Sequence, residues 1–136
     1  RELTSLVPVA GHLYGGNRDG RLLRWSIAKP SDPPVELLQE PHAIYMLKLA
    51  WVGGLPHLVI GSKQMGVAMR PLNDLSLSTG YTCDEPVRWV DATSDIVAAV
   101  SADQRHLFLW STHEPRRPMR RITPGEKIQD MCVWLR

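Results

Sequence analysis

Two stretches of the sequence repeat one pattern: LYGGNRDGRLLRWS at residues 13–26 and IVAAVSADQRHLFLWS at residues 96–111. Each is a short apolar strand, a tight polar turn, and a second strand that ends in Trp-Ser. The turns carry Asp19 and Asp103, and the strands end at Trp25 and Trp110. The two tryptophans are 85 residues apart, so a repeat of about 42 residues would fit twice between them.

A third copy stands at the half-way position that this spacing requires. It reads HLVIGSKQMGVAMRPL at residues 57–72, with Pro71 in the place of the tryptophan. Self-similarity at a period of 20 to 50 residues is typical of repeat architectures. The sequence therefore predicts a fold made of successive similar units.

The strand candidates are short and evenly spaced, which favours an all-β architecture. They form three units of four strands, at residues 1–41, 42–86 and 87–126, and a stub at residues 127–136 opens a fourth. The expected strands are residues 3–9, 12–16, 21–27 and 35–39; 43–52, 57–61, 67–70 and 75–81; and 87–92, 96–100, 106–111 and 119–122. A β-sandwich also has short strands joined by turns, but the recurrence near 42 residues favours radially stacked sheets.

The units resemble WD40 repeats, which have about 40–45 residues, four strands, an early G-H pair and a late W-D pair. The matching pieces are the turn aspartates, the terminal tryptophans, a small residue before each turn, and a histidine in the G-H position. The last two features are Asn17, Ser62, Ser101 and His42. The sequence departs from the family pattern in two ways. Ser, and not Asp, follows the terminal tryptophans Trp25 and Trp110, and the second unit lacks both the turn Asp and the terminal Trp.

The resemblance implies a WD40-like β-propeller fragment of four-stranded antiparallel blades. Propellers typically have four to eight blades, so three blades and a stub leave the ring open in this chain alone. An open blade would expose a large apolar face. We therefore expect the remaining blades in the rest of the polypeptide or in another chain. The family's His–Ser/Thr–Asp–Trp hydrogen-bond chain is complete in no unit.

Four residues are expected to have structural roles. Trp25 and Trp110 are predicted to be buried on third strands. Asp19 and Asp103 are predicted to form the turns between second and third strands, where their carboxylates would accept backbone N–H bonds.

No pattern in the sequence indicates catalysis, a cofactor or a metal site. The five histidines have no metal-ligand spacing, and no phosphate-binding glycine loop or nucleophile elbow occurs. The net charge of +2 is too balanced to predict a nucleic acid or an anionic membrane as partner. The arginines around residues 116–121 form the largest charge cluster, and a solvated loop and edge strand explain them best.

A non-catalytic scaffold that presents loops to a protein partner is the expected function. Candidate contacts lie at the turn-bearing end of the units, where large side chains mix with isolated charges. They are Arg18, His42, Tyr45, Lys63, Met65, Trp89, Gln104 and Arg105. The alternative is a sensor or regulatory domain of a larger effector protein. Two widely spaced cysteines and the lack of a signal peptide predict an intracellular, cytoplasmic setting.

Overall fold

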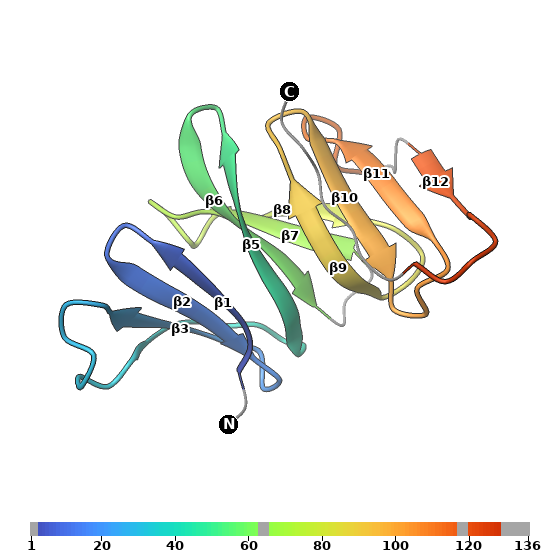
Figure 1. Cartoon of the computed structure of the whole chain (residues 1–136). Helices are drawn as coiled ribbons and strands as arrows, with labels where there is room; N and C mark the ends of the chain where they lie inside the picture. The colour runs from blue at the N-terminus through green and yellow to red at the C-terminus, as the bar shows by residue number, and fades with distance from the viewer. Residues whose placement is uncertain (1–2, 63–65, 117–119, 129–136) are drawn as a thin grey trace.

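The structure is a computed structural model that describes residues 3–62, 66–116 and 120–128. In this part of the chain all regular structure is β, arranged as three antiparallel four-stranded sheets (Figure 1). The first sheet contains β1 (Leu3–Val9), β2 (His12–Asn17), β3 (Arg21–Ser26) and β4 (Val35–Gln39). The second contains β5 (Ile44–Val52), β6 (Leu55–Ser62), β7 (Gly66–Pro71) and β8 (Thr79–Thr82). The third contains β9 (Val87–Ala92), β10 (Ile96–Ser101), β11 (Leu107–Ser111) and β12 (Arg120–Ile122).

Each sheet is a simple meander in which neighbours along the chain are neighbours in space. Each sheet also falls within one of the units predicted from the sequence, and most strand ends lie within two residues of the predicted positions. The exception is β8, which starts at Thr79 instead of residue 75. The carboxylate of Asp74 accepts bonds from the backbone N–H and the hydroxyl of Ser76, and this local turn keeps the chain from extending earlier. The stub at 127–136 lies mostly outside the described residues.

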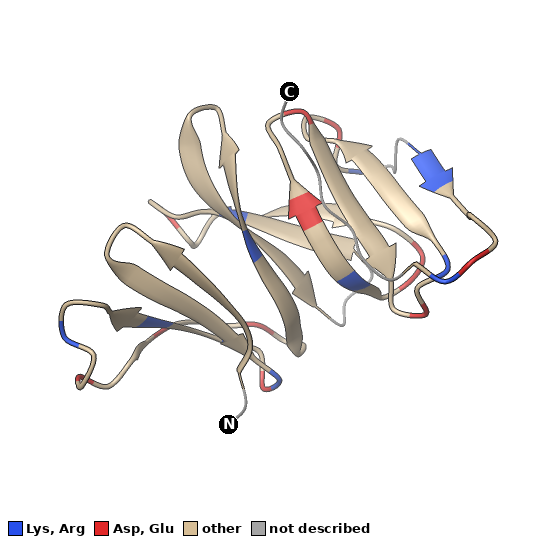
Figure 2. Cartoon of the chain, viewed as in Figure 1, with Lys and Arg blue, Asp and Glu red and all other residues tan. Residues whose placement is uncertain are grey.

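The sheets stack side by side in chain order, with their first strands β1, β5 and β9 in contact (Figure 1). One apolar core lies between the first and second sheets and includes Tyr14, Leu22, Leu47 and Ile60. A second core lies between the second and third sheets and includes Met69, Tyr81, Phe108 and Trp110. The second strands β2, β6 and β10 contain no Lys, Arg, Asp or Glu (Figure 2). Such strands are suited to burial on both faces.

Glycines on second strands allow neighbouring sheets to approach closely. A Cβ built on Gly16 of β2 would lie 2.5 Å from Cγ2 of Ile44 on β5. A Cβ built on Gly61 of β6 would lie 2.9 Å from Cγ1 of Val90 on β9. Both separations are shorter than van der Waals contact, so a larger residue would force the sheets apart.

The links between sheets are fixed by ion pairs. Glu40, just before the second sheet, is buried and accepts from the guanidinium of Arg70 on β7 at 3.2 Å. Glu85, just before the third sheet, lies 2.9 Å from the guanidinium of Arg121 on β12. In each case a glutamate in the link pairs with an arginine of the sheet that follows.

The two repeated tryptophans differ in burial, which corrects one of the predictions. Trp110 is fully buried, packs edge-on against Tyr81 of the preceding sheet, and donates from Nε1 to the carbonyl of Thr82 at 3.2 Å. Trp25 occupies the same place on β3 but is only half-buried, because no described sheet covers that face of the first sheet. Around it lies an apolar hollow of about 340 Å³, lined by Leu3, Leu6, Leu13, Trp25, Ser26, Ile27 and Pro30.

In the described part of the chain, no helix has the length and apolarity needed to cross a membrane.

Because the two tryptophans differ in burial, truncating each of them to alanine should lower the free energy of unfolding by different amounts. Trp110→Ala should lower the free energy of unfolding by about 3–5 kcal/mol, the range for a buried aromatic residue. Trp25→Ala should cost about half of that or less, since part of its ring already contacts water. Urea denaturation of both variants measures the difference. Equal losses would contradict the packing described here.

Candidate functional site

The turns between second and third strands and the links between sheets meet at one end of the molecule, the turn end. It comprises residues 17–20, 40–43, 83–86 and 101–105. Backbone hydrogen bonds join these segments directly. The N–H of Glu40 donates to the carbonyl of Gly20 at 2.7 Å, and the N–H of Ala102 donates to the carbonyl of Pro86 at 2.9 Å. Loops held by backbone bonds on a rigid scaffold are common locations for binding residues.

Side-chain acceptors fix the geometry of these turns. In the third sheet, Oδ1 of Asp103 accepts from the Ser101 hydroxyl at 2.6 Å and from the Arg105 N–H at 3.1 Å. Asp103 thus accepts a backbone N–H in the turn where the sequence analysis expects it to do so. In the first sheet, the described acceptor is Oδ1 of Asn17, which takes bonds from the N–H groups of Asp19 and Arg21 at 3.0 Å each. The sequence analysis expects Asp19 to accept backbone bonds in this turn, and Asn17 accepts these two.

A hollow of about 460 Å³, the arginine hollow, opens where the three sheets converge at the turn end. Its walls come from all three sheets: Leu3, Thr4, Arg18, Tyr45, Arg88 and Ala102. Arg18 and Arg88 are exposed, and Tyr45 is half-buried. The stacking of the sheets thus brings together residues that are far apart in the sequence.

Arg88 is positioned by two neighbours. Its guanidinium carbon lies 5.2 Å from the ring centre of Trp89, within cation–π range. Its Nη1 donates to Oε1 of Gln104 at 3.4 Å. Gln104 is itself held in place by Ile128. Its side-chain Nε2 donates to the carbonyl of Ile128 at 2.8 Å, and its backbone carbonyl accepts from the Ile128 N–H.

The structure groups some of the predicted contact residues and separates others. Arg18 and Tyr45 line the arginine hollow, while Trp89 and Gln104 adjoin it through Arg88. His42 is exposed on the link before the second sheet, and Arg105 lines a different hollow. Lys63 and Met65 lie outside the described residues. Sequence reasoning missed Arg88. Its position beside Trp89 at the start of a first strand was the available signal.

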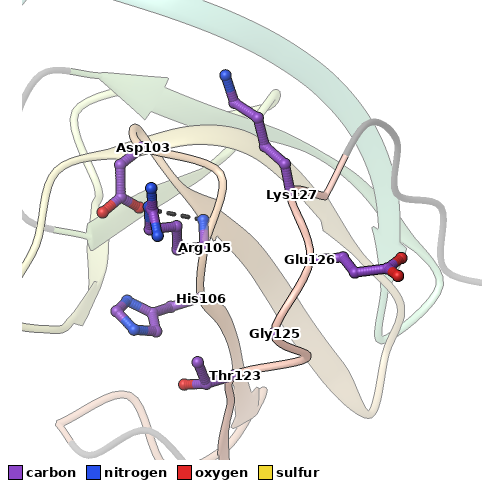
Figure 3. A pocket seen from close by; sticks show the side chains of 7 residues that line it. All are labelled: Asp103, Arg105, His106, Thr123, Gly125, Glu126 and Lys127. Carbon is purple, nitrogen blue, oxygen red and sulfur yellow. Dashed lines mark hydrogen bonds between the residues drawn. The ribbon is translucent and has the colours of Figure 1, made fainter.

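That second hollow, of about 630 Å³, lies between the third-sheet turn and the segment after β12 (Figure 3). Its lining residues are Asp103, Arg105, His106, Thr123, Gly125, Glu126 and Lys127. The side chains of Glu126 and Lys127 extend away from His106 (Figure 3). The carboxylate of Asp103 is occupied by its turn bonds. The charged groups of Asp103, Glu126 and Lys127 therefore do not point toward one common position, and we do not assign a binding site to this hollow.

Glu85, Asp103 and His106 place one possible metal-ligand atom each within 4.8 Å of one another. Oε2 of Glu85 is already shared by Nδ1 of His106 at 2.8 Å and by the Arg121 guanidinium at 2.9 Å. The positive charge of Arg121 would repel a cation there. We therefore interpret this group as an ion-pair cluster that holds β12 against the link before the third sheet.

Comparisons with known proteins give a likeness of fold only. No family model matches the chain, and no curated protein matches it in sequence. Among solved structures, the computationally designed Ika8 protein is similar with a TM-score of 0.66 and 15% identity, over 88% of this chain and 36% of that one. The computationally designed Ika4 protein is similar with a TM-score of 0.67 and 15% identity, over 88% of this chain and 71% of that one. The chain thus spans little more than a third of the length of Ika8.

The turn bond between Ser101 and Asp103 should be visible in a titration. The Ser101 hydroxyl, followed by the Arg105 N–H, lowers the pKa of Asp103 below its ordinary value. Because the folded pKa is depressed, the ionised carboxylate stabilises the fold above the unfolded pKa. This stabilisation is lost as the pH falls through the folded pKa.

Ser101→Ala should raise the pKa of Asp103 toward its ordinary value, as measured by NMR titration of the carboxyl carbon. Thr123→Ala, on the same hollow, should leave that pKa unchanged. If the serine variant titrates like the wild-type chain, the assigned hydrogen bond is absent in solution.

Proposed function

We propose that this chain is a segment of a WD40-like β-propeller that acts as a non-catalytic scaffold and binds a protein partner at its turn end. Three consecutive four-stranded meanders with their first strands together support the propeller part of the proposal. The Ser101–Asp103 turn resembles part of the family's hydrogen-bond chain, although Trp110 does not continue that chain and donates to the Thr82 carbonyl.

The uncovered face of the first sheet supports the presence of further blades beside this segment. Leu6 is 49% exposed and Ile27 is 55% exposed on that sheet, next to the half-buried Trp25. The corresponding face of the third sheet buries Trp110 against the second sheet. A preceding blade, from the same polypeptide or from another chain, would bury Trp25 in the same way.

The observation that carries the binding part of the proposal is the arginine hollow. It is built by three sheets, it exposes charged groups, and an aromatic residue and an amide position one of them. Hot spots of protein interfaces are enriched in arginine, tyrosine and tryptophan. Arginine and tyrosine line the hollow, and Trp89 lies beside it against Arg88. Of the eight contact residues expected from the sequence, Arg18 and Tyr45 line the hollow, while Trp89 and Gln104 adjoin it.

Photo-crosslinking tests this proposal on one strand with a matched control. Benzoylphenylalanine is placed at Tyr45, beside the hollow, or at Trp51, which is 58% exposed at the other end of β5. In cells of the source organism, the Tyr45 probe should crosslink a discrete protein. The Trp51 probe should not, since it lies at the other end of β5, away from the turn end.

Equal crosslinking from both positions, or none from Tyr45, would contradict an interaction surface at the turn end. Charge reversal at Arg116, which is exposed and does not line the arginine hollow, should leave the Tyr45 crosslink intact.

A further inference from the structure

We propose that the arginine hollow binds an acidic segment of the partner, whose carboxylates pair with Arg18 and Arg88. This inference rests on the proposed scaffold function and adds the chemistry of the ligand. It starts from how the arginines of this chain are used.

Several arginines are already committed to carboxylates. Arg21 lies 3.3 Å from Glu36, Arg70 lies 3.2 Å from Glu40, and Arg121 lies 2.9 Å from Glu85. Among the described residues, neither Arg18 nor Arg88 has a carboxylate within ion-pairing distance. Both are exposed, and both line the same hollow from different sheets. Two such guanidinium groups on one hollow form a local positive site.

The other groups of the hollow fit a carboxylate ligand. The Thr4 hydroxyl is occupied, because it donates to the carbonyls of Gly16 and Ile44. The Tyr45 hydroxyl makes no hydrogen bond within the described structure and can donate one to an acceptor. Guanidinium and hydroxyl groups are donors, and a carboxylate accepts several such bonds at once.

Arg88 is also preorganised for this role. The ring of Trp89 supports its guanidinium, and Gln104 restrains it through a side chain that is held by Ile128. A donor that is already positioned loses less conformational entropy on binding, which favours affinity. The Gln104 contact leaves the remaining N–H groups of Arg88 available to a ligand, since arginine carries five donors.

An acidic protein segment fits this site better than a nucleic acid does. Nucleic-acid affinity comes mainly from many lysines and arginines that each neutralise a phosphate along a strand. The hollow provides two such groups, and the net charge of the whole chain is only +2. A short run of Asp or Glu side chains needs no more than these two arginines and a hydroxyl.

The test uses the full chain and three labelled probes: an oligoglutamate peptide, an oligolysine peptide and a single-stranded DNA. Fluorescence anisotropy should detect binding of oligoglutamate but not of oligolysine, and the affinity should fall as salt is added because the arginines are exposed. The double variant Arg18→Glu/Arg88→Glu should weaken oligoglutamate binding about tenfold or more, since two charge-assisted contacts become repulsive. Arg120→Glu, the same change at an exposed position on β12, should stay within about twofold of the wild-type affinity.

Two results would overturn the proposal: no binding of oligoglutamate, or an equal loss in the Arg120 variant. Tighter binding of the DNA, lost in the same double variant, would instead identify a nucleic-acid site. If oligoglutamate fails to bind while the Tyr45 crosslink persists, the scaffold function stands and only the acidic chemistry is wrong. If the crosslink is also absent, the interaction surface itself is wrong.

Discussion

Close contact between one sheet's second strand and the next sheet's first strand determines how this molecule is arranged. Gly16 faces Ile44 at the first junction, and Gly61 faces Val90 at the second, with no room for a Cβ at either glycine. A β-branched side chain therefore fills the space above a bare backbone, and each sheet lies directly against its neighbour. A glycine within a strand lowers the stability of that strand, and the close packing of the sheets offsets this loss of stability. Once the sheets are this close, their apolar faces exclude water and form the two cores.

The same stacking creates the turn end as a composite surface. Because β1, β5 and β9 start close together, residues from three sheets share one hollow although each of those strands belongs to a different sheet. The ion pairs Glu40–Arg70 and Glu85–Arg121 fix the links at this end, so the loops between sheets are held from both sides. Arg18 on the first-sheet turn, Tyr45 on β5 and Arg88 on β9 therefore line one surface that is built on packed sheets, and such a scaffold favours a preorganised binding site.

Much of this fold could be read from the sequence, because its repeat shows directly in the residues. The strand β1 at Leu3–Val9, the strand β9 at Val87–Ala92 and the turn role of Asp103 follow from alternation and turn chemistry. The burial of Trp25 could not be predicted, because it depends on which sheet covers the first one and not on local pattern. Arg88 was missed for a similar reason: only the spatial convergence of three sheets distinguishes it from an ordinary exposed arginine. The glutamate partners of Arg70 and Arg121 also depend on contacts across junctions, which a linear pattern does not reveal.

The central claim is that glycine contacts set the stacking of the sheets, and methyl NMR tests it most directly. In the full chain with labelled Ile and Val methyl groups, nuclear Overhauser effects report which protons lie in contact. The account predicts strong cross-peaks from the Ile44 methyl to the α protons of Gly16, and from the Val90 methyls to those of Gly61. The absence of either set, in a chain whose within-sheet cross-peaks are intact, would contradict this arrangement of the sheets and the hollow that depends on it.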